Sequence, residues 1–286
     1  MRRYRRIVMS DNFVLLTKSE ENPHIAILTL NRPDAGNALN TPFLEALSEK
    51  IDEVENDTSI RVLIIHSNGK HASFGADLNE LVVEKDGAYS NMSKSDAKKH
   101  IDDGRIVIGK LFNLRVPTIG LIHGFCLGGG AEVYTACDVL YGASGGKDEG
   151  GLMYGFPEPS IGVMAGWMGP ELLVKRIGAG FAKDILFSGR FVGPDEAMSM
   201  GIVQGIFPKD ELMPRAMKWA SSVAANAPYA VESTRRTLNH VLFPHFKDVL
   251  ESTGSETIDN LMTEDFVKGA KKILSKSKEQ PKYERK

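Results

Sequence analysis

Cysteine is scarce in this chain, and long hydrophobic runs are missing. Only two of the 286 residues are cysteines, Cys126 and Cys137, and they lie eleven positions apart. This spacing fits neither a zinc site nor a disulfide scaffold, so we expect two buried thiols in a reducing, cytoplasmic compartment. The longest apolar runs, such as residues 62–65, have the length of a strand. The sequence therefore predicts no transmembrane helix.

A strong excess of charge of either sign is also missing. The chain has 35 Lys and Arg residues against 37 Asp and Glu residues, which gives a formal net charge of -2 at pH 7. Such a balance predicts no general electrostatic attraction to nucleic acid or to an anionic membrane. Residues 1–12 are basic, but their apolar part is too short for a secretory signal. We expect a disordered basic arm there.

Strand and helix patterns alternate through the first two thirds of the chain. Residues 13–16 and 25–30 are typical of strands in an opening hairpin, and Thr41-Pro42 begins an amphipathic helix. Further strands are expected at residues 62–65, 118–122 and 139–141, with helices at residues 101–114 and 128–136. This order predicts an α/β core over residues 13–195, with parallel strands, crossover helices and repeated β-β-α units.

The last third of the chain is mostly helical in pattern. Helices are expected at residues 217–225, 229–241, 249–262 and 264–276. We expect residues 196–286 to form a helical oligomerisation region, because helices that cannot bury themselves on one core often form subunit interfaces. The polar stretch at residues 79–99 is predicted to be a mobile loop, either a lid over a pocket or a surface insertion without a role.

Two glycine-containing segments each follow a predicted buried strand. In the first, Gly75 permits a turn that leaves the backbone N–H of Ala76 free to point into a cleft. In the second, three successive glycines at residues 128–130 open a helix whose first N–H groups, including that of Gly129, have no partner within the helix. If the N–H groups of Ala76 and Gly129 face one another, they form an oxyanion hole for a carbonyl.

Two glutamates lie beside these turns. Glu132 comes just inside the predicted helix, where the helix dipole favours a carboxylate. Glu158 lies between two prolines in an apolar turn, where burial favours a raised pKa and proton transfer near neutral pH. Taken singly, each glutamate is more often structural. The pair suggests acid–base chemistry only if the fold brings both carboxyls to one site.

Histidines and lysines give weaker signals. Four histidines (His66, His71, His100 and His123) have no partner at metal-ligand spacing, so no metal site is predicted. The lysines clustered between residues 268 and 282 are either a solvated helix face or a contact for the phosphates of a ligand.

At this point the segments resemble the crotonase, or enoyl-CoA hydratase/isomerase, superfamily from about residue 13 to residue 282. The resemblance is carried by Asn-Arg-Pro with Asn-Ala-Leu at residues 31–39, Gly-Ala-Asp-Leu at residues 75–78, Gly-Gly-Gly-Ala-Glu at residues 128–132 and Cys-Asp at residues 137–138. It implies a spiral of β-β-α turns with a C-terminal helical trimerisation region, in a trimer or a dimer of trimers. It also implies an acyl-CoA substrate, with no separate cofactor.

The resemblance assigns roles to residues at matching positions. The N–H groups of Ala76 and Gly129 would bind the thioester oxygen, while Glu132 and Glu158 would add water to a 2-enoyl-CoA and give a 3-hydroxyacyl-CoA. The positions matching substrate or CoA contacts are Arg32, Ala35, Ala38, Leu39, Phe74, Asp77, Leu78 and Lys282.

The chain departs from the family pattern around the acyl group. Phe74 replaces a small residue, about six extra residues lie near positions 144–151, and Ala165, Trp167 and Met168 replace proline and small residues in the pocket wall. An unusual or cyclic acyl group is therefore conceivable. Two alternatives stay open, an enoyl or dienoyl-CoA isomerase and a non-catalytic scaffold or RNA-binding protein with this fold.

Overall fold

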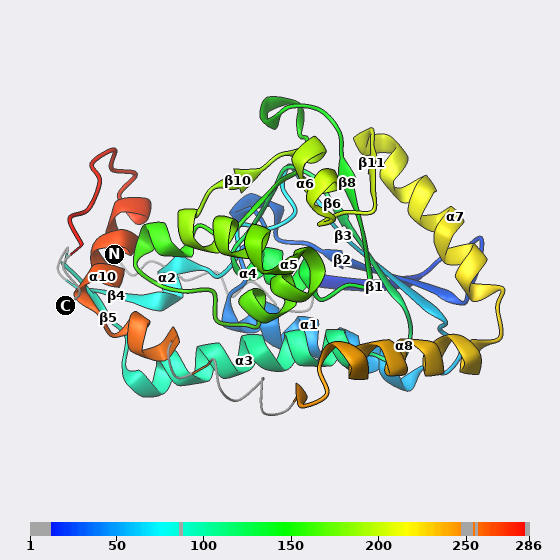
Figure 1. Cartoon of the computed structure of the whole chain (residues 1–286). Helices are drawn as coiled ribbons and strands as arrows, with labels where there is room; N and C mark the ends of the chain where they lie inside the picture. The colour runs from blue at the N-terminus through cyan, green and yellow to red at the C-terminus, as the bar shows by residue number, and fades with distance from the viewer. Residues whose placement is uncertain (1–12, 86–87, 247–253, 255–256, 284–286) are drawn as a thin grey trace, which may run out of the picture.

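The computed structural model describes residues 13–85, 88–246, 254 and 257–283 (Figure 1). The predicted arm at residues 1–12 lies outside them, as does part of the helix expected at residues 249–262. The opening hairpin is confirmed, because β1 (Val14–Lys18) and β2 (Ile25–Leu30) pair antiparallel. The helix α1 (Thr41–Asn56) is also confirmed, and the Asn40 side chain caps it by accepting the N–H of Phe43.

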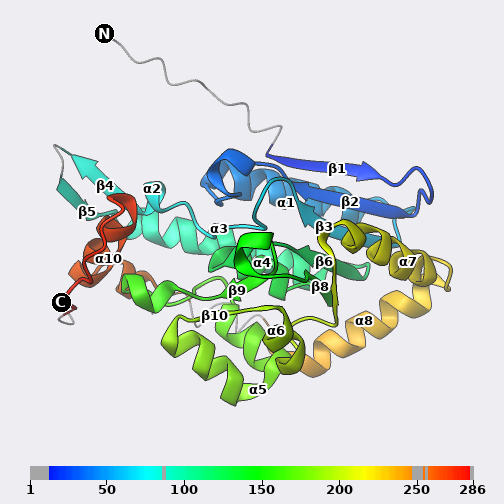
Figure 2. The same ribbon diagram turned by 90° about the horizontal axis from the view of Figure 1, so that it is seen from above.

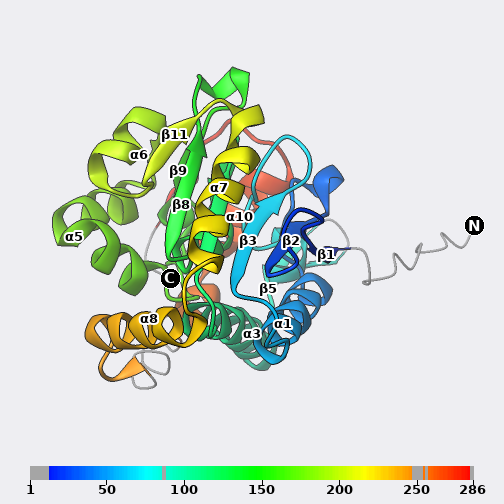
Figure 3. The same ribbon diagram turned by 90° about the vertical axis from the view of Figure 1, so that its right-hand side faces the viewer.

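The main sheet has six strands in the order β1-β2-β3-β6-β8-β11. From β2 onward the pairs are parallel, through β3 (Val62–Ser67), β6 (Thr118–Ile122), β8 (Val139–Ala143) and β11 (Gly205–Phe207). β3 and β6 are apolar runs without alternation because side chains on both faces are covered. The helix α7 (Leu212–Ala224) packs against β2, β3, β6 and β8 (Figure 3).

A second sheet has three strands, which are interspersed along the chain with strands of the main sheet. It consists of β10 (Phe191–Val192), β9 (Met153–Gly155) and β7 (Phe125–Leu127). The chain passes from β6 to β7 and into α4 (Gly129–Thr135), then from β8 to β9 and towards α5 (Gly169–Ser188). The β-β-α order therefore occurs twice, and the predicted α/β class is confirmed, with mixed rather than only parallel sheets.

The expectation of a loop at residues 79–99 is wrong. The helix α2 (Leu78–Leu81) leads into the antiparallel hairpin of β4 (Val82–Lys85) and β5 (Ala88–Asn91). The helix α3 (Lys94–Asn113) then begins at a Ser93 cap. The segment is mostly polar in composition, so its pattern gives little sign that Leu81 and Val82 are buried in the core. The C-terminal helix α10 (Glu264–Leu274) lies beside this hairpin (Figure 2).

The C-terminal third contains the expected helices α7, α8 (Pro228–Leu242) and α10, together with α6 (Pro194–Met200). It also contributes β11, which sequence patterning missed because three residues carry no periodicity. The division at residue 195 and the oligomerisation role stay predictions. In the part of the chain that the structure describes, no helix has the length and apolar content needed to cross a membrane.

Candidate active site

The turn at Gly75 lies against the start of helix α4. Gly75 has a φ of 85°, and a Cβ built on it would lie 3.0 Å from the backbone nitrogen of Gly129. Leu39 donates its N–H to the carbonyl of Gly75 at 2.8 Å, and Asp77 donates its N–H to the carbonyl of Leu39 at 3.1 Å. This parallel bridge uses the residues on either side of Ala76 and leaves the N–H of Ala76 outside the ladder.

A hydroxyl supports the same turn from inside. The buried Ser73 side chain accepts the N–H of Gly75 at 3.1 Å and donates to the carbonyl of Asn37 at 2.8 Å. The N–H of Gly129, at the first position of α4, has no acceptor within that helix. Segments more than fifty residues apart thus bring the Gly75 turn and Gly129 together, and backbone N–H groups of such a turn can bind an anion or a polarised carbonyl.

Glu132 is buried at the first turn of α4, with 2% of its surface exposed. Its Oε1 accepts the N–H of Trp167 at 2.8 Å and the N–H of Gly169 at 2.6 Å. A Cβ on Gly169 would come within 2.8 Å of the same oxygen. Glycine at this position therefore lets the backbone approach the carboxyl closely enough to bind it.

Glu158 starts the 3-10 helix η4 (Glu158–Ile161) and is 9% exposed. A Cβ on Gly128 would lie 2.8 Å from its Oε1, so this carboxyl also lies against the start of α4. Its Oε2 is buried and has no hydrogen-bond partner among the described residues. A buried carboxyl oxygen without a donor favours the protonated form.

Both carboxyls have raised pKa values. Burial raises the pKa of Glu132 to about 8, and the nearby charge of Glu158 adds to the rise. Burial likewise raises the pKa of Glu158 to about 7. Both groups therefore change protonation near neutral pH, as an acid–base pair requires.

These raised pKa values also predict a pH-dependent stability. The folded protein binds these two protons more tightly than the unfolded chain does. The contribution of the two carboxyls to the free energy of unfolding is therefore fully present below the unfolded pKa of about 4.5, and it is lost as pH rises through 7 to 8. We expect Glu158→Gln to be more stable than wild type by roughly 1 to 3 kcal/mol at pH 8, with little difference at pH 4. Urea unfolding at both pH values measures this, with the exposed Glu49→Gln as the control. If Glu158→Gln and wild type have the same free energy of unfolding at pH 8 as well as at pH 4, the expectation is contradicted.

The expected acyl-pocket residues Ala165, Trp167 and Met168 are all buried. The Trp167 ring lies directly over Gly129, because a Cβ on that glycine would approach the ring to 2.4 Å. The ring also lies against α3, where its centroid is 5.2 Å from that of the His100 ring. The Trp167 ring therefore occupies the space next to the candidate oxyanion hole.

Two of the residues expected to contact CoA bind each other. Arg32 forms a 2.7 Å ion pair with Asp77 and also donates to the carbonyl of Ala38 at 2.8 Å. These contacts connect the 3-10 helix η2 (Pro33–Ala35) with the start of α2, which follows the Gly75 turn. The pair therefore connects the two segments on either side of the turn.

The remaining expected CoA contacts vary in exposure. Leu39 is fully buried, whereas Ala35 and Leu78 are partly buried. Phe74 is 44% exposed, with its ring against Gly36 and 4.8 Å from the His71 ring. Lys282 is exposed in the tail, where the adjacent Tyr283 donates its hydroxyl to the carbonyl of Ser160 in η4. The tail therefore reaches the element that carries Glu158.

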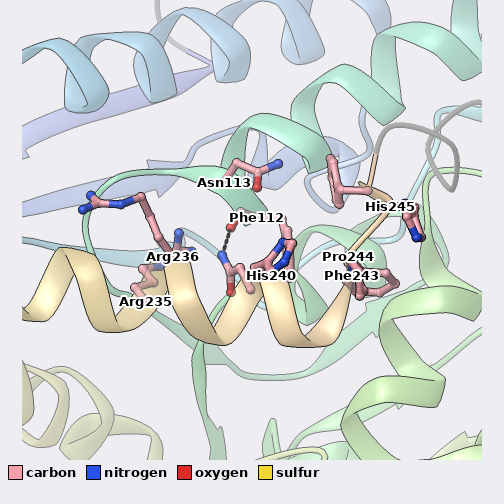
Figure 4. Close-up of a pocket in the computed structure, with 10 residues that line it drawn as sticks. Phe112, Asn113, Arg235, Arg236, His240, Phe243, Pro244 and His245 are labelled. Atoms are coloured by element: carbon pink, nitrogen blue, oxygen red, sulfur yellow. Dashed lines mark hydrogen bonds between the residues drawn. The ribbon is translucent and has the colours of Figure 1, made fainter.

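A separate cavity lies away from the glutamates. It has a volume of about 410 Å³ between the ends of α3 and α8 (Figure 4). Phe112, Phe243 and Phe246 form an aromatic cluster in it, and Asn239 donates to the carbonyl of Phe112. Within the described residues no cluster of His, Cys, Asp or Glu could hold a metal ion.

Sequence reasoning missed Arg105, which donates to the carbonyl of Gly166 at 3.0 Å beside the site. The available signal was a charged residue on the apolar face of α3, between Ile101 and Ile108 at helical spacing. It also missed the N–H groups of Trp167 and Gly169 that bind Glu132. Nearly every residue type has a backbone N–H group, so residue identity cannot indicate which of these groups are donors to a side chain.

The Gly75 turn, the start of α4 and two buried carboxyls lie together, an arrangement of the kind that can polarise a carbonyl and move protons. The model of the enoyl-CoA hydratase/isomerase family matches residues 20–285. The chain belongs to that family.

Known relatives cover most of the chain. The short-chain-enoyl-CoA hydratase of Clostridium acetobutylicum is 32% identical over 81% of this chain and 82% of its own length. A mitochondrial Delta(3,5)-Delta(2,4)-dienoyl-CoA isomerase of Dictyostelium discoideum is 29% identical over 81% of this chain and 78% of its own.

A crystal structure has the same fold. An enoyl-CoA hydratase/isomerase from Xanthobacter autotrophicus Py2 superimposes with a TM-score of 0.79 over 93% of this chain and 94% of its own, at 22% identity. These matches support the crotonase fold and the expected acyl-CoA chemistry of the family, either hydration or isomerisation.

Proposed function

We propose that this protein is an enoyl-CoA hydratase that adds water to a 2-enoyl-CoA and gives a 3-hydroxyacyl-CoA. The observation that carries the proposal is the presence of both Glu132 and Glu158, buried against the start of α4 and beside Gly129. Hydration needs one group to take a proton from water and another to give a proton to carbon. Two carboxyls with raised pKa values meet that need.

In the proposed mechanism the thioester oxygen binds the N–H groups of Ala76 and Gly129, which draws electrons from the double bond and makes C3 electrophilic. Glu132 takes a proton from water as the oxygen bonds to C3. Glu158 gives its proton to C2 as the double bond breaks. The two carboxyls then exchange one proton, through solvent or directly, to restore the starting state.

This mechanism requires an ionised Glu132 and a protonated Glu158. Taken alone, the higher pKa of Glu132 would keep the proton there. We place the proton on Glu158 instead, because Glu132 accepts two backbone N–H groups while Oε2 of Glu158 has no donor among the described residues. Hydrogen bonds to the charged form are what hold a buried carboxylate ionised.

The direct test is an assay with crotonyl-CoA, in which hydration removes the absorbance of the conjugated thioester. We expect wild-type turnover and its loss in Glu132→Gln and Glu158→Gln. Equal rates for all three proteins would overturn the proposal.

The second candidate is an isomerase that moves the double bond of an enoyl or dienoyl-CoA. It is favoured by the similarity to a dienoyl-CoA isomerase and by the closed wall around the carboxyls, which are nearly excluded from solvent. An isomerase of this kind would convert a 3-enoyl-CoA to a 2-enoyl-CoA and leave the product unhydrated.

We propose that Trp167, with Ala165 and Met168, limits the acyl chain. An acyl group whose carbonyl oxygen is bound at Gly129 would have its chain next to the Trp167 ring. Replacing Trp167 by leucine should raise the preference for an eight-carbon over a four-carbon enoyl-CoA by about 10- to 100-fold in kcat/KM, because each added methylene group gains about 0.8 kcal/mol on burial.

The control for this prediction is Trp219→Leu in α7, which removes the chain's other indole, a partly buried one that packs on the other side of the sheet. Kinetics with both substrates measure the ratio. A Trp167→Leu protein with the wild-type preference would show that the acyl chain takes another path.

We further propose that Arg32, Ala35, Ala38, Leu39, Phe74, Asp77, Leu78 and Lys282 form the CoA-binding surface. Its support is that the first seven lie on two segments held together by the Arg32–Asp77 pair and by the bridge between Leu39 and Ala76. The C-terminal helices are proposed to form a homotrimer or a dimer of trimers, which light scattering would measure.

A further inference from the structure

Arg105 is a buried cation on the face of α3 that packs toward the candidate active site. Its residue is 3% exposed, and its neighbours on that face are small or apolar. Placing a guanidinium in such surroundings is unfavourable unless it is hydrogen-bonded and balanced by negative charge. Its partners therefore indicate why a cation is held there.

The first partner connects Arg105 to Glu132 through a single peptide group. Arg105 donates from Nη1 to the carbonyl oxygen of Gly166 at 3.0 Å. The N–H of the same peptide belongs to Trp167, and it donates to Oε1 of Glu132 at 2.8 Å. Because a peptide group is planar, with its carbonyl and N–H on opposite sides, fixing the carbonyl also fixes the direction of the N–H. A cation on the carbonyl also strengthens the N–H as a donor.

The second kind of partner is the set of carboxyl groups near the candidate active site. Burial lowers the pKa of Arg105, and the nearby carboxyls of Glu171, Glu132 and Asp102 oppose that effect. Among the described residues, the ionisable groups that interact with Glu132 include Glu158 on η4, Glu171 on α5 and Tyr154 on β9. Glu158 and Glu171 both disfavour a negative charge on Glu132, whereas Arg105 on α3 favours one.

We propose that Arg105 is a positioning residue which, through the peptide between Gly166 and Trp167, holds the Glu132 carboxylate in place for its reaction with water. It does not touch the substrate in this account. The inference rests on the proposed hydratase function and adds to it the residue on which the base depends.

The test compares Arg105→Met and Arg105→Lys with wild type in the crotonyl-CoA assay across pH. In Arg105→Met we expect kcat to fall by about 10-fold or more while KM changes by less than about threefold, because ground-state binding is untouched. The acidic limb of the kcat/KM profile, which reports ionisation of the base, should move up by about one pH unit. Arg105→Lys keeps the charge and should recover part of both effects.

The matched control is Arg235→Met. Arg235 is also buried, at 6% exposure, and donates to the backbone carbonyls of Leu111 and Leu114, but its ion pair is with Asp138, away from the glutamates. This variant should lose stability without moving the pH profile. A merely structural role for Arg105 would give the same pattern in Arg105→Met.

The outcomes separate the two proposals. If wild type does not hydrate any enoyl-CoA, the proposed function fails. If wild type is active and Arg105→Met keeps the wild-type kcat and acidic limb, the inference about Arg105 alone is overturned. If Arg105→Met does not fold, Arg105→Lys decides, since it loses the planar two-pronged donor but keeps the charge; a wild-type kcat and pH profile in that variant would overturn the inference.

Discussion

Replacing Glu158 by glutamine is expected to lower kcat for enoyl-CoA hydration by about 10²- to 10⁴-fold, the usual contribution of a positioned general acid. Glutamine has nearly the same shape but no proton of the required acidity. Because Oε2 of Glu158 has no hydrogen-bond donor among the described residues, the change breaks no contact there. KM for the enoyl-CoA should stay within about threefold, since the thioester and CoA contacts are untouched.

The companion change, Glu132→Gln, should cost a similar factor for a different reason. Its side-chain oxygen can still accept the N–H groups of Trp167 and Gly169, but it cannot take a proton from water. Combining both changes should cost little more than the larger single effect, because residues that act as a unit are not additive. Steady-state kinetics of the three variants, with Glu49→Gln as an exposed control, measure this. Full activity in either single variant would contradict the assigned roles.

The second large effect is expected from Gly75→Ala. A methyl group there would approach the carbonyl of Leu127 to 2.7 Å and the nitrogen of Gly129 to 3.0 Å, so the Gly75 turn and the start of α4 must separate. The φ of 85° adds backbone strain. Loss of one oxyanion donor typically costs about 10²- to 10³-fold in kcat, and we expect a decrease of that order.

Gly201→Ala is the matched control for this change. Gly201 has a φ of 84°, almost the same as Gly75, but a Cβ there meets nothing within 4 Å. Both substitutions therefore place a side chain at a positive φ of nearly the same value, and only Gly75→Ala is expected to displace the N–H groups. Circular dichroism and melting establish that both proteins fold, and kinetics then compare them. Equal kcat values for the two variants would show that the Gly75 turn does not form part of the site.

Much of the fold could be predicted from the sequence because several long elements carry clear periodicity, although the 20-residue helix α5 was missed. Helix α1 has an asparagine cap and an apolar stripe, and β3 is an unbroken apolar run. The strands that were missed, including β4, β10 and β11, have two to four residues each. Their pairing is decided by the chain that lies next to them, which local patterns do not encode.

For the candidate site, residue identity predicted the titratable groups but not the contacts between them. Spacing alone could not place Gly75 beside Gly129, and that contact was expected only from the family resemblance. Residue identity predicted titratable carboxyls at positions 132 and 158. It could not predict the donors to Glu132, because those are backbone groups of Trp167 and Gly169 positioned by a turn.

The central claim is that water becomes part of the product, and incubation in heavy-oxygen water tests it most directly. Wild-type protein with crotonyl-CoA should give a 3-hydroxyacyl-CoA that carries one heavy oxygen at C3, as mass spectrometry of the product would show. Glu158→Gln should form that labelled product about 10²- to 10⁴-fold more slowly. A wild-type protein that converts enoyl-CoA substrates only into unlabelled double-bond isomers would contradict the account.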